Sequence, residues 1–280
     1  MKKIAVLLFV FSVICSSRTQ AQAWGKAKGE GFFKLDFTSI KAQDVFDNFG
    51  KIVPFRTLGN YTTAVYGEYG LGNKITVYGY APLWVSNQLA ALQGAQTGNI
   101  ISEGAARNGV GDIDLGIRYP LLTGKWSVSL NVLLGLPTGN STDINALFTG
   151  DGEFNQLAKI NVGTGATKWW TQGGIGFNNR TKNNSDEIRY EFEFGYKFLN
   201  ERLLAMLKVG GIQSLNNGAG FGAATGLFSN NVEYTGIGPE VLYYLNSSKK
   251  YGISGRVAGT LGGRNVLAAP SFSVGAFAQF

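Results

Sequence analysis

One stretch of the chain decides the fold: residues 187–198 read EIRYEFEFGYKF. Apolar and aromatic residues occupy every second position from Ile188 to Phe198, and most positions between them are charged. A period of two places the two kinds of side chain on opposite faces of a β-strand, whereas a helix would scatter both around its surface. Residues 111–122 and 126–136 repeat the pattern. The sequence therefore predicts strands with one apolar and one polar face.

The same alternation, applied throughout, predicts an all-β chain of about twelve strands. They cover residues 29–40, 60–71, 74–84, 111–122, 126–136, 153–164, 168–178, 187–198, 202–213, 232–245, 250–262 and 270–280. Two of them fit less well. In residues 153–164, Lys159 interrupts the apolar face in one register, and in residues 232–245, Pro239 cannot donate a hydrogen bond to a neighbouring strand.

The connections between these strands alternate in length. Short turns follow the even-numbered strands, and longer segments follow the odd-numbered ones, at about 41–59, 85–110, 137–152, 179–186, 214–231 and 263–269. An even strand count with this alternation is typical of a transmembrane antiparallel β-barrel with short periplasmic turns and long extracellular loops. A soluble β-sandwich also alternates, but long loops gathered at one end fit it poorly.

Composition narrows the function classes. The 280 residues include 40 Gly, one Cys and no His, and only 15% are charged. Without His there is no imidazole base and no His-ligated metal, and Cys15 lies in a segment that we expect to be removed. We therefore predict that the protein is not an enzyme and uses no cofactor or metal.

The first 23 residues are typical of a secretory signal peptide. Lys2 and Lys3 precede an apolar run at residues 4–14, and Ala21-Gln22-Ala23 matches an A-x-A cleavage site. The apolar run is too short to span a bilayer as a helix. Cleavage would leave one domain, residues 24–280, which is only mildly basic and carries no nucleic-acid signature.

In a barrel of this kind the polar face points into the lumen and the apolar face contacts lipid. The predicted lumen-lining residues are Lys34, Asp36, Glu68, Asp112, Asp114, Arg118, Arg189, Glu191, Glu193, Lys197, Lys208, Glu240 and Arg256. The apolar face would contact outer-membrane lipid and lipopolysaccharide.

The chain ends on Phe280, with apolar residues at alternate positions before it. This ending resembles the C-terminal signal that the barrel-assembly machinery reads on outer-membrane barrels. The alternative is an ordinary edge strand, although no residue follows that could cover such an edge.

Two segments carry a family resemblance: residues 109–119, GVGDIDLGIRY, and residues 136–139, LPTG. They resemble the meta-pathway phenol-degradation family of outer-membrane barrels, which is similar to fatty-acid and toluene transporters. The resemblance implies passive uptake of small hydrophobic or aromatic solutes across the outer membrane of a Gram-negative bacterium. One departure is that the first strand begins soon after the cleavage site, so an N-terminal hatch has no room and any plug would come from loops or inward side chains.

The long loops are unusually apolar, which favours capture of a small ligand, although the loops could instead pack on one another. Candidate ligand-capture residues are Phe46, Phe49, Phe55, Leu89, Leu92, Phe148, Phe221 and Phe228. Residues 86–93 could form a short helix that gates the pore or lies on the surface.

Three other patterns point to sites less strongly. The pairs Glu191/Glu193 and Asp112/Asp114 are spaced near the range of glycosidase carboxylates, but inward charges more often form a lumen wall. A calcium site at Asp143, Asp151 and Glu153 competes with a solvated acidic loop. Residues 218–222 only loosely resemble a dinucleotide fingerprint.

The sequence thus favours an outer-membrane channel for small hydrophobic or aromatic solutes. A structural or adhesive barrel with an occluded lumen is the main alternative. A hydrolase is a third reading, and it is limited to carboxylate chemistry.

Overall fold

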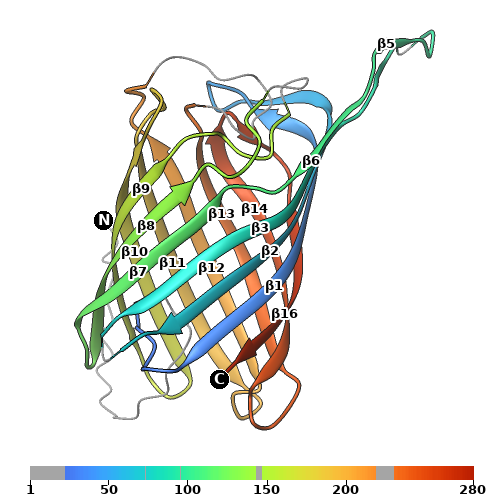
Figure 1. Ribbon diagram of the computed structural model, residues 1–280. Helices are drawn as coiled ribbons and strands as arrows, with labels where there is room; N and C mark the ends of the chain where they lie inside the picture. The colour runs from blue at the N-terminus through green and yellow to red at the C-terminus, as the bar shows by residue number, and fades with distance from the viewer. Residues whose placement is uncertain (1–22, 73, 95, 143–146, 219–229) are drawn as a thin grey trace, which may run out of the picture.

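The computed structural model describes residues 23–280, apart from residues 73, 95, 143–146 and 219–229. Within this part of the chain, twelve long antiparallel strands form one closed barrel (Figure 1). They are β1 (Gly31–Phe46), β2 (Ile52–Gly70), β3 (Thr76–Leu89), β7 (Ile113–Leu122), β8 (Trp126–Leu136), β9 (Asn155–Gly165), β10 (Trp169–Arg180), β11 (Glu187–Phe198), β12 (Leu203–Ser214), β13 (Glu233–Tyr244), β14 (Tyr251–Arg264) and β16 (Ser271–Gln279). The predicted fold class is confirmed.

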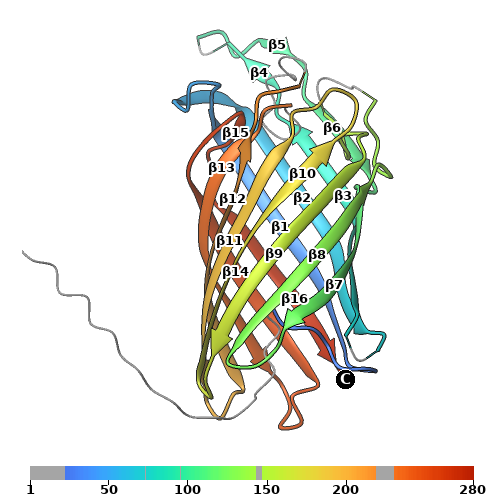
Figure 2. The same ribbon diagram turned by 90° about the vertical axis from the view of Figure 1, so that its left-hand side faces the viewer.

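The barrel closes where β1 pairs with β2 on one side and with β16 on the other. The last residue takes part in this closure, since the Gly31 amide donates to the Phe280 carbonyl at 2.8 Å and the Phe280 amide donates back at 3.1 Å. Within the described residues, closure gives each of the twelve long strands a hydrogen-bonded neighbour on both sides, so that the backbone groups of the wall are paired within the protein, as hydrocarbon requires. Both views show the strands tilted around one axis (Figures 1 and 2).

Burial in the strands is the reverse of that in a soluble protein. On β8, Ser127, Ser129 and Asn131 are buried, whereas Trp126 and Val132 are exposed. The exposed side chains form an apolar belt around the outside, and the polar ones point inward. This sidedness is that of a barrel whose solvent is lipid.

The strands extend further toward the extracellular end than the sequence predicted. Residues 41–46 continue β1 and residues 52–59 continue β2, so only residues 47–51 connect them. Four short strands occur in the longer connections: β4 (Leu92–Gln93), β5 (Ile100–Ser102), β6 (Ala105–Gly109) and β15 (Val266–Leu267). The β4–β5 ribbon projects beyond the barrel (Figure 1).

The predicted helix at residues 86–93 is wrong. Residues 86–89 continue β3, which pairs there with β2 on one side and β6 on the other, and residues 92–93 form β4. The polar residues Ser86 and Asn87 are buried and Leu89 packs in an apolar cluster, so pairing on both sides overrides the local helical pattern. None of the described residues is helical, so no helix long and apolar enough to cross a membrane occurs among them.

Both strands that fitted the pattern poorly are present. Lys159 is buried on the polar face of β9. Pro239 pairs with Leu207 of β12, but the ladder between β13 and β14 steps from Ile237–Gly259 to Glu240–Arg256. The ladder omits Gly238 and Pro239, and proline has no amide hydrogen to donate there.

Candidate functional site in the barrel interior

An apolar cluster lies in the barrel interior at its periplasmic end. Its buried members are Phe32, Trp170, Leu204, Met206, Leu242, Tyr244 and Phe277, with Trp24 and Tyr66 packed against them. We call it the periplasmic cluster. Gly195 makes room for the Trp170 indole, because a Cβ at that position would lie 2.0 Å from the ring. The indole Nε1 of Trp170 in turn donates to Glu193 at 2.6 Å.

The residues before β1 fold into the same end of the barrel. The Ala23 amide donates to the Gln172 side chain at 2.8 Å, and the Ser127 hydroxyl donates to the Ala23 carbonyl at 2.6 Å. The Trp24 indole lies against Gly163, where a Cβ would meet it at 2.5 Å. Residues 23–29 therefore act as a small inner segment at the periplasmic end. The expectation that the N-terminus had no room for a plug did not allow for so short a segment.

Arg118 fastens this segment to the wall. Its guanidinium donates to the Trp24 carbonyl at 3.0 Å, to Asn131 at 3.0 Å and to Glu68 at 3.3 Å. It also lies 5.2 Å from the centre of the Tyr78 ring. Arg118 is 1% exposed, and the contacts above compensate the burial of its charge.

Above the periplasmic cluster, ion pairs link strands across the barrel interior, since Lys34 of β1 and Glu240 of β13 are separated by β14 and β16 in the sheet. Glu240 accepts from Lys34 at 2.8 Å and lies 2.7 Å from Lys208, which in turn lies 3.4 Å from Glu193. Lys34 also contacts Asp36 at 3.1 Å. These five residues, predicted to line the lumen, form one continuous network.

A second network runs along β8, β9 and β11. Asn131 donates to Asn161 at 2.9 Å, and Asn161 donates to Glu191 at 2.5 Å. Glu191 also pairs with Lys159 at 2.8 Å. The uncharged amides of this network were missed as site residues, although their places on the polar face were visible in the alternation.

Arg180 organises the extracellular end of β10. It contacts Glu153, donates to Glu187 at 2.9 Å and lies 3.8 Å from Asp151. Burial, together with the charge of Asp151, raises the pKa of Glu153 to about 8, although Arg180 opposes the shift. Glu187 also binds Arg189 at 2.9 Å.

The remaining predicted lumen residues lie in different places. Asp112, just before β7, accepts from the backbone amides of Gly139 and Asp151 at 2.8 and 2.9 Å, so it holds a loop. Asp114 lies on β7 opposite Tyr80. Lys197 is buried and lies 3.4 Å from Glu201 in the turn after β11.

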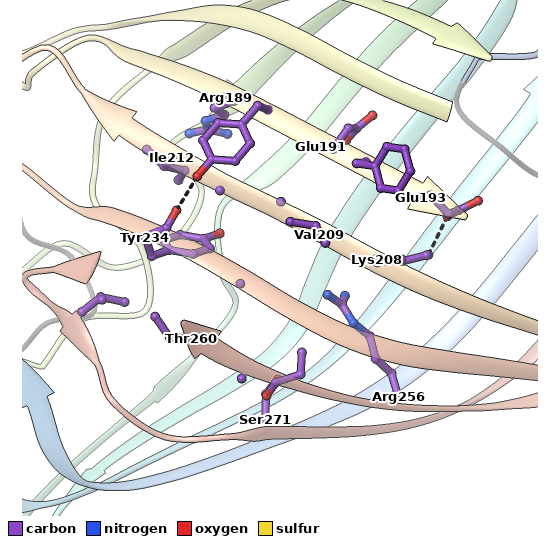
Figure 3. Close-up of a pocket in the computed structure, with 18 of the residues that line it drawn as sticks. Arg189, Glu191, Glu193, Lys208, Val209, Ile212, Tyr234, Arg256, Thr260 and Ser271 are labelled. Carbon is purple, nitrogen blue, oxygen red and sulfur yellow. Dashed lines mark hydrogen bonds and ion pairs between the residues drawn. The ribbon is translucent and has the colours of Figure 1, made fainter. Parts of the chain in front are cut away.

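A cavity of about 670 Å³ lies inside the barrel among β1 and β9–β16. We call it the central chamber. Its lining includes residues that were predicted to face the lumen (Figure 3). They are Arg189, Glu191 and Glu193 of β11, Lys208 of β12 and Arg256 of β14. Gln172, which binds Ala23, lines its periplasmic side. The chamber therefore begins where the inner segment ends.

A second apolar cluster lies toward the extracellular end. Its buried members are Ala42, Val45, Leu58, Leu89, Leu147 and Leu267. Leu267 also lines the central chamber, so this extracellular cluster is the opposite boundary of that cavity. Polar residues thus occupy the middle of the interior, with an apolar layer on either side.

The predicted ligand-capture residues separate into three groups. Phe46 and Leu89 are buried in strands, and Phe55 packs against the extracellular cluster. Phe49 and Leu92 are exposed, and Phe148 is half-buried, with its carbonyl accepting from Asn87. Phe221 and Phe228 lie outside the described residues.

The weaker candidates gain no support from geometry. Asp143 lies outside the described residues, while Asp151 and Glu153 are both engaged with Arg180. No cluster of three or more metal-ligating side chains occurs in the described ranges. Glu191 and Glu193 each have a lysine partner.

A closed antiparallel barrel with an apolar exterior and a polar interior defines the class: this is a transmembrane β-barrel of the outer membrane. The model of the family described as "Putative MetA-pathway of phenol degradation" matches residues 55–274, and the chain belongs to that family. No curated protein matches the chain.

Solved structures share the fold. An outer-membrane channel from Pseudomonas putida F1 has a TM-score of 0.69 at 13% identity, covering 94% of this chain and 100% of that one. The NanC porin has a TM-score of 0.52 at 10% identity, covering 88% and 100%. The translocator domain of the autotransporter NalP from Neisseria meningitidis has a TM-score of 0.50 at 11% identity, covering 91% and 90%. These proteins are a channel, a porin and a translocator rather than enzymes.

Proposed function

We propose that the barrel is a passive outer-membrane channel for the uptake of small solutes with hydrophobic or aromatic bodies. The central chamber carries the proposal, because about 670 Å³ is enough for a small ligand and lies inside a closed transmembrane wall. On this proposal the protein is not an enzyme and needs no cofactor.

Apolar side chains at the extracellular end support a hydrophobic solute. Phe49, Ile52, Ile100 and Ile101 are all exposed there, beyond or at the ends of the long strands. Exposed apolar groups outside the lipid-facing belt commonly mark binding surfaces. Such a surface would concentrate a poorly soluble compound at the mouth of the barrel.

Passage requires the inner segment to move. Trp24 packs on the periplasmic cluster and Ala23 is bonded across the barrel to β8 and β10. The segment is short and Gln172, to which it is hydrogen-bonded, lines the chamber, so its displacement would open the chamber toward the periplasm. We propose that it is the periplasmic gate.

A structural or adhesive barrel with an occluded lumen is the second candidate. It is favoured by the two apolar clusters, which fill the interior on both sides of the chamber. The two candidates differ in one measurable property, which is whether a solute crosses.

Uptake by whole cells tests the proposal. The outer leaflet of lipopolysaccharide slows hydrophobic compounds, so a strain lacking the gene should take up a labelled monoaromatic compound more slowly than one expressing the protein. Trp24→Ala should speed uptake severalfold, whereas Trp126→Ala, on the exposed outer face, should not. If the deletion strain takes up the compound as fast as strains that express the unmodified protein, Trp24→Ala or Trp126→Ala, the result would favour the occluded barrel.

A further inference from the structure

The charges that line the central chamber are not all compensated. Four of its lining residues are basic: Lys159, Arg189, Lys208 and Arg256. Only two, Glu191 and Glu193, are acidic. The excess of positive charge raises the question of which basic group lacks an anionic partner.

Three of the basic groups are paired inside the barrel. Lys159 lies 2.8 Å from Glu191, and Lys208 lies 2.7 Å from Glu240 and 3.4 Å from Glu193. Arg189 binds the carboxylate of Glu187 through both Nε and a terminal nitrogen at 2.9 Å.

Arg256 is different. Its position on β14 faces Glu240 of β13 and Ser273 of β16 in the register, so it shares their inward face. Within the described residues its guanidinium has no hydrogen bond or ion pair, because Glu240 is already held by Lys34 and Lys208. Figure 3 shows the Arg256 side chain extending into the chamber near Lys208. The chamber therefore presents one free guanidinium.

A guanidinium is a fork of N–H donors that matches the oxygen pair of a carboxylate or the oxygens of a sulfonate or phosphate. Elsewhere in the chamber Ile212 and Tyr234 provide apolar and aromatic surface (Figure 3). Arg256 is exposed within the barrel interior, so an anion in the chamber can reach its guanidinium.

We infer that Arg256 is the binding site for the anionic group of the transported solute, so that the solute class is small organic acids with an aromatic or aliphatic body. The inference rests on the proposed channel function and gives it a substrate class. The apolar loops would select the body of the solute, and Arg256 would select its charge.

Paired probes of equal shape and opposite charge test this inference. Benzenesulfonate and phenyltrimethylammonium both carry one permanent charge and one ring, and neither crosses a bilayer readily. The full-length mature protein is reconstituted into liposomes, and the influx of each ion is measured. We expect benzenesulfonate to enter severalfold faster than the cation.

Arg256→Gln should bring the two rates close to each other, and Arg256→Lys should retain part of the preference. Lys168→Gln is the matched control, because it removes one positive charge from an exposed turn between β9 and β10. The shift in gel mobility on heating shows that each variant is a folded barrel. A preference unchanged in Arg256→Gln would overturn the inference while leaving the channel function intact.

Binding separates failure of the inference from failure of the channel. If neither ion crosses, titration calorimetry of benzenesulfonate into the protein in detergent decides the matter. Binding that is lost in Arg256→Gln but kept in Lys168→Gln would uphold the anion site and reject transport. No binding to the unmodified protein would reject both.

Discussion

Arg118 and Glu68 form an ion pair at 3.3 Å in the barrel interior, where the two side chains are 1% and 4% exposed. The pair is closed from the periplasm by the inner segment, whose Trp24 carbonyl accepts from the same guanidinium. Arg118 thus both pairs with a buried carboxylate and helps to hold the inner segment in place.

Arg118→Ala should destabilise the barrel by about 3–5 kcal/mol, because it leaves the Glu68 carboxylate buried without its partner. The free energy of unfolding in urea, measured in detergent micelles or lipid vesicles, checks this. The double variant Glu68→Gln/Arg118→Met should lose less stability than the sum of the losses in the single variants Glu68→Gln and Arg118→Met. Additive losses would show that the pair makes no cooperative contribution.

Glu153 should make stability depend on pH. Burial and Asp151 raise its pKa from 4.5 to about 8, so the folded protein holds the proton more tightly than the unfolded chain. Its contribution to stability is therefore full below pH 4.5 and is lost as the pH rises through about 8. Glu153→Gln, which cannot ionise, should lose less stability over this window in unfolding experiments at a series of pH values.

A second variant makes this test specific. Asp151→Asn removes the neighbouring negative charge, so the loss of stability should move to lower pH and become smaller. If the wild type and both variants follow the same pH profile, Glu153 is not the titrating group.

Phe280 should act in assembly as well as in stability. Its ring stacks on Phe33 with centroids 6.0 Å apart, and its backbone pairs with Gly31 at the closing seam. We propose that the barrel-assembly machinery reads this residue. Phe280→Ala should strongly reduce the amount of folded protein in the outer membrane, while Phe280→Tyr should restore it.

The same variants refolded in detergent separate the two roles. If Phe280→Ala folds there with nearly normal stability, the cellular loss reflects recognition. If it is equally defective in detergent, Phe280 serves only the closing seam.

The predicted signal peptide and its cleavage position can be tested on the purified protein. The sequence pattern predicts a cut after Ala23, yet Ala23 is fully buried and hydrogen-bonded through both its amide and its carbonyl. We therefore expect Ala23 to be retained, with the cut after Ala21, where Thr19 supplies the second small residue of the motif. Intact-mass measurement of the purified protein decides between them, and a mature chain that begins at Trp24 would contradict this expectation.

Most of the fold could be predicted because a bilayer imposes strict alternation on every strand. Residues 126–136 and 187–198 were placed without error at either end, since lipid admits only apolar side chains on one face. Above the membrane this constraint ends. Residues 86–89 were therefore misread, because their pairing with β2 and β6 depends on segments distant in the sequence.

The interior was harder to predict than the wall. Alternation indicates which residues point inward, and it identified Arg256 and Lys208, but it cannot say which charges meet. Phe32, Trp170 and Phe277 are apolar residues on the inward face, where the rule expects polar ones. Their clustering depends on the curvature of the barrel and on Gly195, which gives the indole its space.

The interruption at Pro239 has a consequence for the motions of the barrel. A closed barrel resists separation of any two neighbouring strands, but the ladder between β13 and β14 lacks the two pairs at Gly238 and Pro239, near the middle of the strands. Transient opening should begin there, so that amide protons of β13 and β14 flanking the gap exchange with deuterium sooner than those of the uninterrupted β10–β11 pair. Pro239 would thus determine where the barrel wall opens transiently.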